Sequence, residues 1–206
     1  MNQVELLAKI AAGNGKVASY LGSVCSQYRP SSAASPLAAG ELLGTLPVFL
    51  APSERLQEHP EWIAQFDYSD TQQGDYLVTP EGTIYFIAAQ VGFAPLVCVQ
   101  TNAIVSLARP VGITSFETTG YSGLIIASSD TLLSAWPASL VASGRAKQGE
   151  AVNDDGLSAW VILLPVLPIV PLVADLIIDD LHRNFVVTAA ERTSLGWQLH
   201  VKQASS

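Results

Sequence analysis

The chain has 206 residues and a formal net charge of −8, with 49% hydrophobic and only 14% charged residues. This balance excludes a disordered chain, and the length allows one large domain or two small ones with a sizeable core. The apolar content exceeds what an average soluble surface requires, so we expect part of it to be buried against other subunits.

Acidic residues are concentrated in residues 54–81, which contain no Lys and only one Arg, Arg55. The seven acidic residues are Glu54, Glu58, Glu61, Asp67, Asp70, Asp75 and Glu81. Tight binding to a nucleic-acid backbone needs clustered Lys and Arg, so this balance argues against it. We interpret the stretch as a solvated acidic face that keeps the protein soluble, and it is also compatible with a surface past which DNA slides.

The first elements are predicted to be helical. Residues 2–12 place Val4, Leu7 and either Ile10 or Ala11 on one helical face, and the segment 13–15 (Gly-Asn-Gly) is expected to end that helix. A second short helical piece is expected over 16–21. The N-terminus shows an amphipathic pattern rather than the basic and apolar regions of a secretory signal.

Strands dominate the prediction from residue 26 onwards. A strand over 26–29 is stopped by Pro30, and the segment 31–37 has the composition of a loop. Further strands are expected over residues 62–66, 76–78, 83–90, 96–100 and 104–108. The turns at 79–82 and 101–102 predict hairpins.

The chain contains an internal repeat. Residues 75–89 read DYLVTPEGTIYFIAA, and residues 175–189 read DLIIDDLHRNFVVTA. Unrelated hairpins also share alternating apolar residues, but the shared acidic residue before the strand, the shared spacing to the aromatic position and the conserved downstream phase favour duplication. The aligned pairs include Asp75 with Asp175, Tyr85 with Phe185, Val97 with Trp197 and Val99 with Leu199, all 100 residues apart, and Trp62 with Trp160, two residues out of step.

The repeat predicts a mainly β protein made of two small antiparallel β-barrel-like units with a short N-terminal helix. We place the boundary near Pro110, so that residues 1–110 form the helix and first unit and residues 111–206 form the second. The second unit is expected to carry an inserted helix and loop region. There, 121–127 reads as a strand, Asp130 as the N-cap of a helical turn over 131–133, and 145–156 as an exposed loop.

The apolar run 160–178 is long enough to span a bilayer. Pro165, Pro168 and Pro171 would each remove a helical hydrogen bond, and Asp175 would lie in hydrocarbon. A strand, a proline-rich connection and a second strand fit this segment better than a membrane helix.

No pattern in the sequence predicts catalytic, cofactor-binding or metal-ligating residues. Nucleophile-elbow and phosphate-loop motifs are absent, and Cys25 and Cys98 are expected to be buried, reduced thiols. The acidic pairs Asp154-Asp155 and Asp179-Asp180 are best explained as turn residues, and Asp75 and Asp175 as caps of the turns that enter their hairpins. The tryptophans Trp62, Trp136, Trp160 and Trp197 are expected to pack in the core or at interfaces.

Several motifs together resemble a family of virion proteins from tailed phages and prophages. The resemblance runs over most of the chain. Its landmarks are residues 73–78 (QGDYLV), 80–83 (PEGT), 85–88 (YFIA), 28–30 (YRP), 108–110 (ARP), 136–140 (WPASL) and 193–197 (TSLGW). The hairpin motif is also similar to that of small β-barrel head-closure proteins. Ala174 departs from the pattern, because a glycine precedes Asp75 in the first copy.

The resemblance implies a non-enzymatic, ring-forming neck or head-completion protein of the virion, assembled in the cytoplasm of the bacterial host. Its implied partners are further copies in a ring of six or twelve, a portal or adaptor ring above, and a tail terminator or tail tube below. Non-specific proximity to genomic DNA is implied, and contact with a membrane is not. A tail terminator or other tail structural protein also remains open.

A second class of function also remains open. The chain could be a carbohydrate- or peptide-binding β module whose groove is lined by exposed aromatics such as Tyr68, Tyr76 and Phe93. For the neck protein, we expect residues 2–12 or the loop 145–156 to dock on neighbouring subunits.

Overall fold

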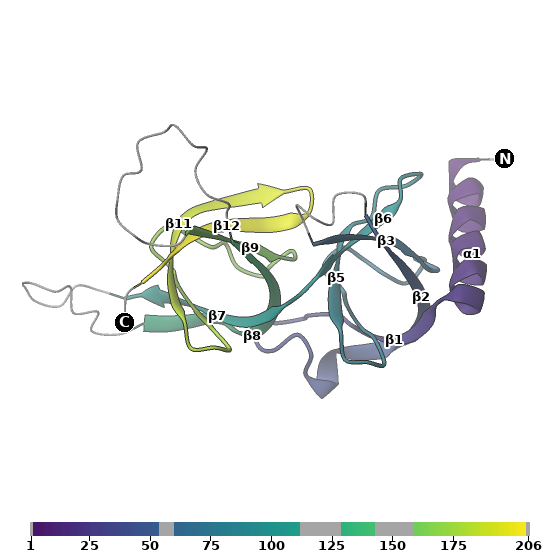
Figure 1. The fold of residues 1–206 in the computed structure, drawn as a ribbon. Coiled ribbons are helices and arrows are strands. Elements are labelled where there is room, and N and C mark those ends of the chain that lie inside the picture. The colour runs from purple at the N-terminus through teal and green to yellow at the C-terminus, as the bar shows by residue number, and fades with distance from the viewer. Residues whose placement is uncertain (1, 54–59, 112–128, 143–158, 205–206) are drawn as a thin grey trace, which may run out of the picture.

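The computed structural model describes residues 2–53, 60–111, 129–142 and 159–204, and it is mainly β. Two closed six-stranded antiparallel barrels lie side by side, and one helix, α1 (Gln3–Leu21), lies beyond the first barrel, on the side away from the second (Figure 1). The predicted fold class is therefore confirmed.

The two barrels have the same strand order. In barrel 1 the order is β1-β2-β3-β6-β5-β4, and in barrel 2 it is β7-β8-β9-β12-β11-β10, so each strand has a counterpart six elements later. Closure of each barrel removes the free edges that an open sheet would present. Barrel 1 contains β1 (Ser23–Tyr28), β2 (Leu42–Pro52), β3 (Glu61–Gln65), β4 (Tyr76–Val78), β5 (Ile84–Ala89) and β6 (Leu96–Gln100), with a short 3₁₀ turn at Ala39–Glu41. Barrel 2 contains β7 (Ala103–Pro110), β8 (Ser129–Ala142), β9 (Ala159–Leu164), β10 (Leu176–Asp179), β11 (Asn184–Thr193) and β12 (Gly196–Gln203).

The strand register corrects one part of the repeat. Cys98 pairs with Ile87 and Trp62, whereas Val201 pairs with Val187 and Trp160. Cys98 and Val201 are therefore counterparts, and β6 and β12 are 103 residues apart rather than 100. The alignment of Val97 with Trp197 and of Val99 with Leu199 was wrong, because the hairpin from β11 to β12 is three residues longer than the one from β5 to β6.

The change from one barrel to the other falls at Thr101 and Asn102, between β6 and β7, rather than near Pro110. The strand that carries Pro110 pairs with β8 and β10 and so belongs to barrel 2. Asn102 holds the junction, because its amide accepts from the Leu140 N–H at 2.7 Å and donates to the Leu140 carbonyl at 2.9 Å.

Helix α1 is continuous where the sequence predicted a break. It begins with a capping box formed by Asn2 and Glu5 and runs through Gly13 and Gly15. Glycine inside a helix costs about 1 kcal/mol relative to alanine, but the burial of Ala18 in the core of barrel 1 favours the longer helix. At Gly15 the backbone passes close to Asp67, where a Cβ atom would lie only 3.0 Å from the aspartate Cβ.

Residues 130–133, predicted as a helical turn after Asp130, belong to β8 instead. This strand pairs with β7 along its first part and with β9 along its last part. Leu133, Trp136 and Leu140 are buried by that pairing, so tertiary contacts override the local helical signal. The sequence prediction also missed β2. The predicted strand at 121–127 and loop at 145–156 lie outside the described residues.

The run 160–178 folds as predicted, as β9, a proline-rich connection and β10. Within the described ranges no helix has the length and hydropathy needed to cross a membrane.

The barrels are joined by a shared core. The outer face of β4, β5 and β6 buries Tyr76, Phe86, Ala88 and Val99 in the same cluster as the interior of barrel 2. The Tyr76 hydroxyl donates to the Pro137 carbonyl at 2.8 Å. The connection between β1 and β2 also reaches β8, because the Ala33 carbonyl accepts from the Trp136 indole N–H at 3.1 Å.

Candidate functional site

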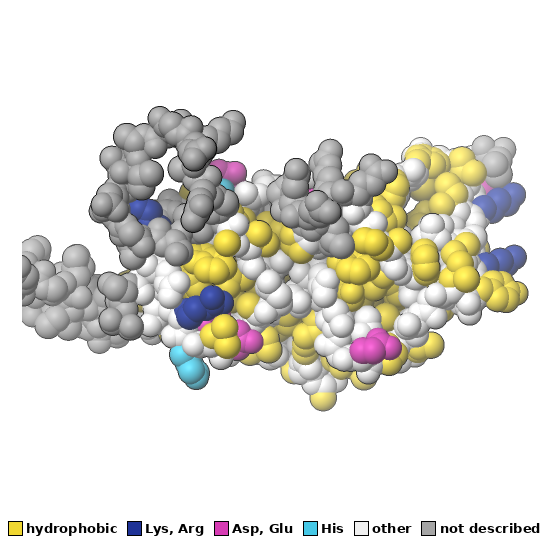
Figure 2. All heavy atoms as spheres, viewed as in Figure 1, with side chains coloured by type: hydrophobic (Ala, Val, Ile, Leu, Met, Phe, Trp, Pro, Cys, Tyr) yellow, Lys and Arg dark blue, Asp and Glu magenta, His cyan; other side chains and the backbone are white. Residues whose placement is uncertain are grey.

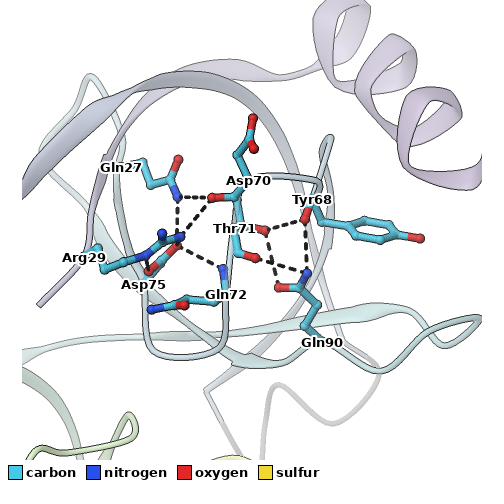
Figure 3. A network of polar contacts seen from close by, with 8 residues as sticks. All are labelled: Gln27, Arg29, Tyr68, Asp70, Thr71, Gln72, Asp75 and Gln90. Carbon is cyan, nitrogen blue, oxygen red and sulfur yellow. Dashed lines mark hydrogen bonds and ion pairs between the residues drawn. The ribbon is translucent and has the colours of Figure 1, made fainter. Parts of the chain in front are cut away.

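One charged site occurs in both barrels. Arg29 follows β1 and Asp75 precedes β4, and their side chains form two parallel hydrogen bonds of 2.8 Å each (Figure 3). Arg109, at the corresponding place in β7, forms the same pair with Asp175, at 2.8 and 2.9 Å. This bidentate geometry is the strongest arrangement available to a guanidinium and a carboxylate.

Each aspartate also closes the turn that precedes its strand. Asp75 Oδ2 accepts from the Gln72 backbone N–H at 3.0 Å, and Asp175 Oδ2 accepts from the Leu172 N–H at 2.8 Å. The predicted capping role is therefore confirmed at both positions. The sequence prediction did not include the repeated Arg–Asp pair, although the Arg-Pro dipeptide occurs at both equivalent positions, 29–30 and 109–110.

Each of these arginines also holds the loop that precedes its aspartate through a further hydrogen bond. Arg29 Nη2 donates to the Asp70 carbonyl at 2.9 Å, and Arg109 Nη2 donates to the Val170 carbonyl at 3.0 Å. The hydrogen bond to Asp75 raises the pKa of Arg29, and the bond to Asp175 raises that of Arg109, so both guanidinium groups are charged at any physiological pH.

The departure at Ala174 does not change the turn geometry. Gly74 has φ +100° and Ala174 has φ +72°, both in the left-handed region. Their N–H groups donate to equivalent carbonyls of β5 and β11, those of Ile87 and Val187, each at 2.9 Å. Ala174 therefore adopts a backbone conformation that has a lower free-energy cost for glycine.

Barrel 1 surrounds its aspartate with a larger polar network. Gln27 Nε2 donates to Asp75 Oδ2 at 2.7 Å, whereas the corresponding residue of barrel 2 is the buried Leu107. Beside it, Gln90 bonds both Thr71 and the Tyr68 carbonyl (Figure 3). Every carboxylate oxygen of Asp75 faces a donor, so this site holds backbone in place and has no oxygen directed at a substrate.

The location of Asp75 changes the interpretation of the acidic stretch. Its side chain is buried and paired with Arg29, so it does not contribute to a solvated face. Asp67, Asp70 and Glu81 are exposed as expected. Glu54 and Glu58 lie outside the described residues.

The two cysteines are buried free thiols in the core of barrel 1. Burial raises the pKa of Cys25 to about 11 and that of Cys98 to about 12, so neither thiol is a nucleophile near neutral pH. In the part of the chain that the structure describes, no three His, Cys, Asp or Glu side chains are grouped as a metal site would require.

Asp179 behaves as a turn residue. Its carboxylate accepts from the backbone N–H groups of Leu181 and Arg183 and pairs with the Arg183 side chain at 2.7 Å. Asp180, beside it, is exposed, and Asp154 and Asp155 lie outside the described residues.

The four tryptophans pack within the molecule. Trp62 meets Tyr85 edge to face in barrel 1, and their counterparts Trp160 and Phe185 do the same in barrel 2. Tyr76 is completely buried, so the groove expected from Tyr68, Tyr76 and Phe93 is not formed by those three side chains. Of the three, Phe93 is exposed and Tyr68 bonds the Leu7 carbonyl of α1.

A shallow hollow of about 300 Å³ lies where the barrels meet, lined by Thr83, Gln100, Asn102 and Asp180 among others. Gln100 accepts from the Trp62 indole and Thr101 donates to the Ile84 carbonyl, so these two polar side chains serve the fold.

Among the residues that the structure describes, the exposed apolar side chains are the remaining candidates for function. Figure 2 shows hydrophobic side chains over both barrels and few charged ones on this face. In the described ranges, fifteen large apolar residues are exposed: Val4, Tyr20, Leu21, Val24, Leu42, Leu43, Val91, Phe93, Ile104, Val111, Val170, Leu172, Val173, Ile178 and Leu181.

Comparison with protein-family models, with curated proteins and with solved structures finds no match for the chain. The assignment of function therefore depends on the residues and their geometry.

Proposed function

We propose that this chain is a structural subunit of a tailed-phage virion neck. In this role it forms a ring between the capsid portal and the tail that lines or closes the DNA passage. The observation that carries the proposal is the exposed apolar surface of two barrels that are already closed and internally packed. Because those side chains are not needed to complete either core, they are available for contacts between subunits.

The charge distribution supports a surface that DNA passes without binding. The chain has ten Lys and Arg residues against eighteen Asp and Glu. Arg29, Arg109 and Arg183 each pair with a buried aspartate, which further reduces the positive charge available to phosphates.

The polar sites of the described residues also fit a structural role. The repeated Arg–Asp pairs hold loops, the thiols are buried, and the aspartates at turns bond backbone groups. We therefore propose that the chain acts through assembly, with a portal or adaptor ring and the tail as its partners.

Cryo-electron microscopy of a purified particle tests this function. We expect density for the double barrel at the portal vertex, in six or twelve copies. Its location elsewhere in the particle, or its absence from the particle, would overturn the neck assignment.

A further inference from the structure

Barrel 1 covers one side of barrel 2 through the loop that precedes Asp75. Gln73 Nε2 donates to the Ser194 carbonyl at 3.2 Å, in the turn between β11 and β12. Gly74 lies against Val166, in the connection that follows β9, where an added Cβ atom would be 3.8 Å from the valine Cβ. Two segments of barrel 2 therefore meet its neighbour, namely the connection after its third strand and the turn between its last two strands.

In barrel 1 the same two segments are covered by α1. Counted from the equivalent tryptophans of β3 and β9, Tyr68 corresponds to Val166. The Tyr68 hydroxyl donates to the Leu7 carbonyl at 3.3 Å. Gly92, in the turn between β5 and β6, also faces Leu7, and its added Cβ atom would lie 3.1 Å from the leucine Cδ2. We call Tyr68 and Gly92 the helix-covered side of barrel 1.

The helix therefore takes the place that a barrel takes at the other contact. Figure 1 shows barrel 2, barrel 1 and α1 in a row, with barrel 1 in the middle. Residues 3–12, expected from the sequence to dock on a neighbouring subunit, pack on barrel 1 of their own chain. Because a barrel of this chain covers the equivalent side of barrel 2, a barrel of a second copy is the partner that fits the helix-covered side.

The contact made by α1 is smaller than the contact between the barrels. Ala11 and Ala18 are the fully buried residues of α1, and both have short side chains. The contact between the barrels completely buries Tyr76 and Phe86 instead. Since the stabilisation from apolar burial is proportional to the area removed from water, the helix is held more weakly than the second barrel.

A break in α1 is also built into its sequence. Gly13 and Gly15 each cost the helix about 1 kcal/mol relative to alanine, and the sequence pattern by itself ends the helix there. Ala18, beyond the glycines, is buried in the core of barrel 1. The helix can therefore open at the glycines, so that residues 3–12 separate from barrel 1 while residues 16–21 stay in place.

We propose that residues 3–12 are an autoinhibitory cap on self-assembly. While they are docked, the helix-covered side is closed and the chain stays monomeric. When they are released, this side binds a barrel of a second copy. The inference rests on the proposed function, because it names the side through which neighbouring subunits join and the element that delays their joining.

Two matched variants of the full chain test the cap. The release variant, Leu7→Glu with Ala11→Glu, places charges on the helix face that packs against barrel 1. The control variant, Ala8→Glu with Ala12→Glu, makes the same change of charge at exposed positions of the same helix. Glutamate is a good helix former, so neither variant lowers the helix propensity by much.

Hydrogen exchange measures the release of residues 3–12, and sedimentation velocity measures self-association. We expect the wild type and the control to stay monomeric with slow exchange in this segment. The release variant should exchange its amide protons at least about tenfold faster and form dimers or larger species. Adding Gly92→Glu to the release variant should return it to the monomer, because the charge then lies on the helix-covered side itself.

Three results would overturn the cap. They are a wild type that associates as strongly as the release variant, a release variant that exchanges quickly yet stays monomeric at its highest soluble concentration, and association that Gly92→Glu does not weaken. If residues 3–12 still exchange slowly, adding Gly15→Glu completes the release, because a Cβ atom there already approaches the Asp67 Cβ to 3.0 Å.

Two further measurements keep the outcomes separate. Circular dichroism of each variant checks that both barrels remain folded. The location of the protein in a particle is determined independently, so a neck protein without a cap is distinguished from a capped protein that is not in the neck.

Discussion

The two barrels differ far more in their surface residues than in their strand order and internal contacts. Both have the same strand order, the same Arg–Asp pair and the same edge-to-face aromatic pair. The outer faces of β5 and β6 in barrel 1 and of β11 and β12 in barrel 2, however, carry different residues. Barrel 1 has Phe86, Ala88 and Val99 there. The corresponding residues of barrel 2 are Val186, Thr188 and Lys202. The first set is buried between the barrels, and Thr188 and Lys202 are exposed.

This difference separates residues that build a barrel from residues that join barrels. The Arg–Asp pair recurs because every copy of the turn needs it. The outer face varies because one barrel has a neighbour in the chain and the other does not. The predictions that follow exchange or remove counterpart residues to test that separation.

The largest loss of stability is expected from a substitution at the contact between the barrels. Trp136→Ala removes a completely buried indole and its bond to Ala33, and should lower the free energy of unfolding by about 4 kcal/mol. Its counterpart Leu46 is only half-buried, so Leu46→Ala should cost about 1–2 kcal/mol. Urea unfolding followed by tryptophan fluorescence and circular dichroism measures both, and equal losses would contradict the special role of Trp136.

The repeated ion pair should contribute to the free energy of unfolding in both barrels, and the contribution should be larger in barrel 1. Asp75→Ala removes the carboxylate that accepts from Arg29, Gln27 and the Gln72 N–H and leaves the Asp70 carbonyl as the remaining acceptor of Arg29 and Gln27, and should cost about 3 kcal/mol. Asp175→Ala leaves one fewer donor unsatisfied, and should cost about 1 kcal/mol less. Unfolding in urea at neutral pH tests the order, which would be refuted if Asp175→Ala were the more damaging change.

The thiols of barrel 1 should be replaceable by the residues of barrel 2. Val105 and Val201 occupy the positions of Cys25 and Cys98, so the double valine variant should lose less than about 1.5 kcal/mol of stability. Burial raises the folded-state pKa of both thiols above the unfolded value. Their contribution is therefore complete below about pH 9 and is lost as the pH rises towards about 11 and 12.

Two measurements check this prediction. The wild type should lose stability between pH 9 and 11 by an amount that the valine variant does not show. A thiol reagent should react with the native wild type far more slowly than with the unfolded chain, and rapid native labelling would contradict the burial of both cysteines.

The smallest effect is expected at the left-handed position before each aspartate. Ala174→Gly should stabilise the protein by about 0.5 kcal/mol, because glycine adopts φ +72° without a Cβ clash. Gly74→Ala should destabilise it by about 1 kcal/mol through the same strain, since its Cβ would meet Val166 only at an ordinary contact distance of 3.8 Å. Thermal unfolding of both variants tests the paired signs, and shifts in the same direction would show that the two turns differ.

Local patterns in the sequence were enough to predict most strands of barrel 1 and the existence of the repeat. The strands over 76–78 and 96–100 coincide with β4 and β6, because alternating apolar residues bounded by Gly, Pro and Asn define both strands and turns locally. Asp75 and Asp175 were assigned to turns for the same reason, since an aspartate bonds its nearest backbone groups.

Only the tertiary structure decided which distant residues meet. The partners Arg29 and Asp75 are 46 residues apart, and nothing local in the sequence specifies that β1 lies beside β4. Residues 131–133 were predicted to form a helical turn, but they are extended in β8, which forms hydrogen bonds with β7 and β9. The surface of each barrel is likewise buried or exposed according to what packs against it, and this is a property of the assembled fold rather than of any short segment.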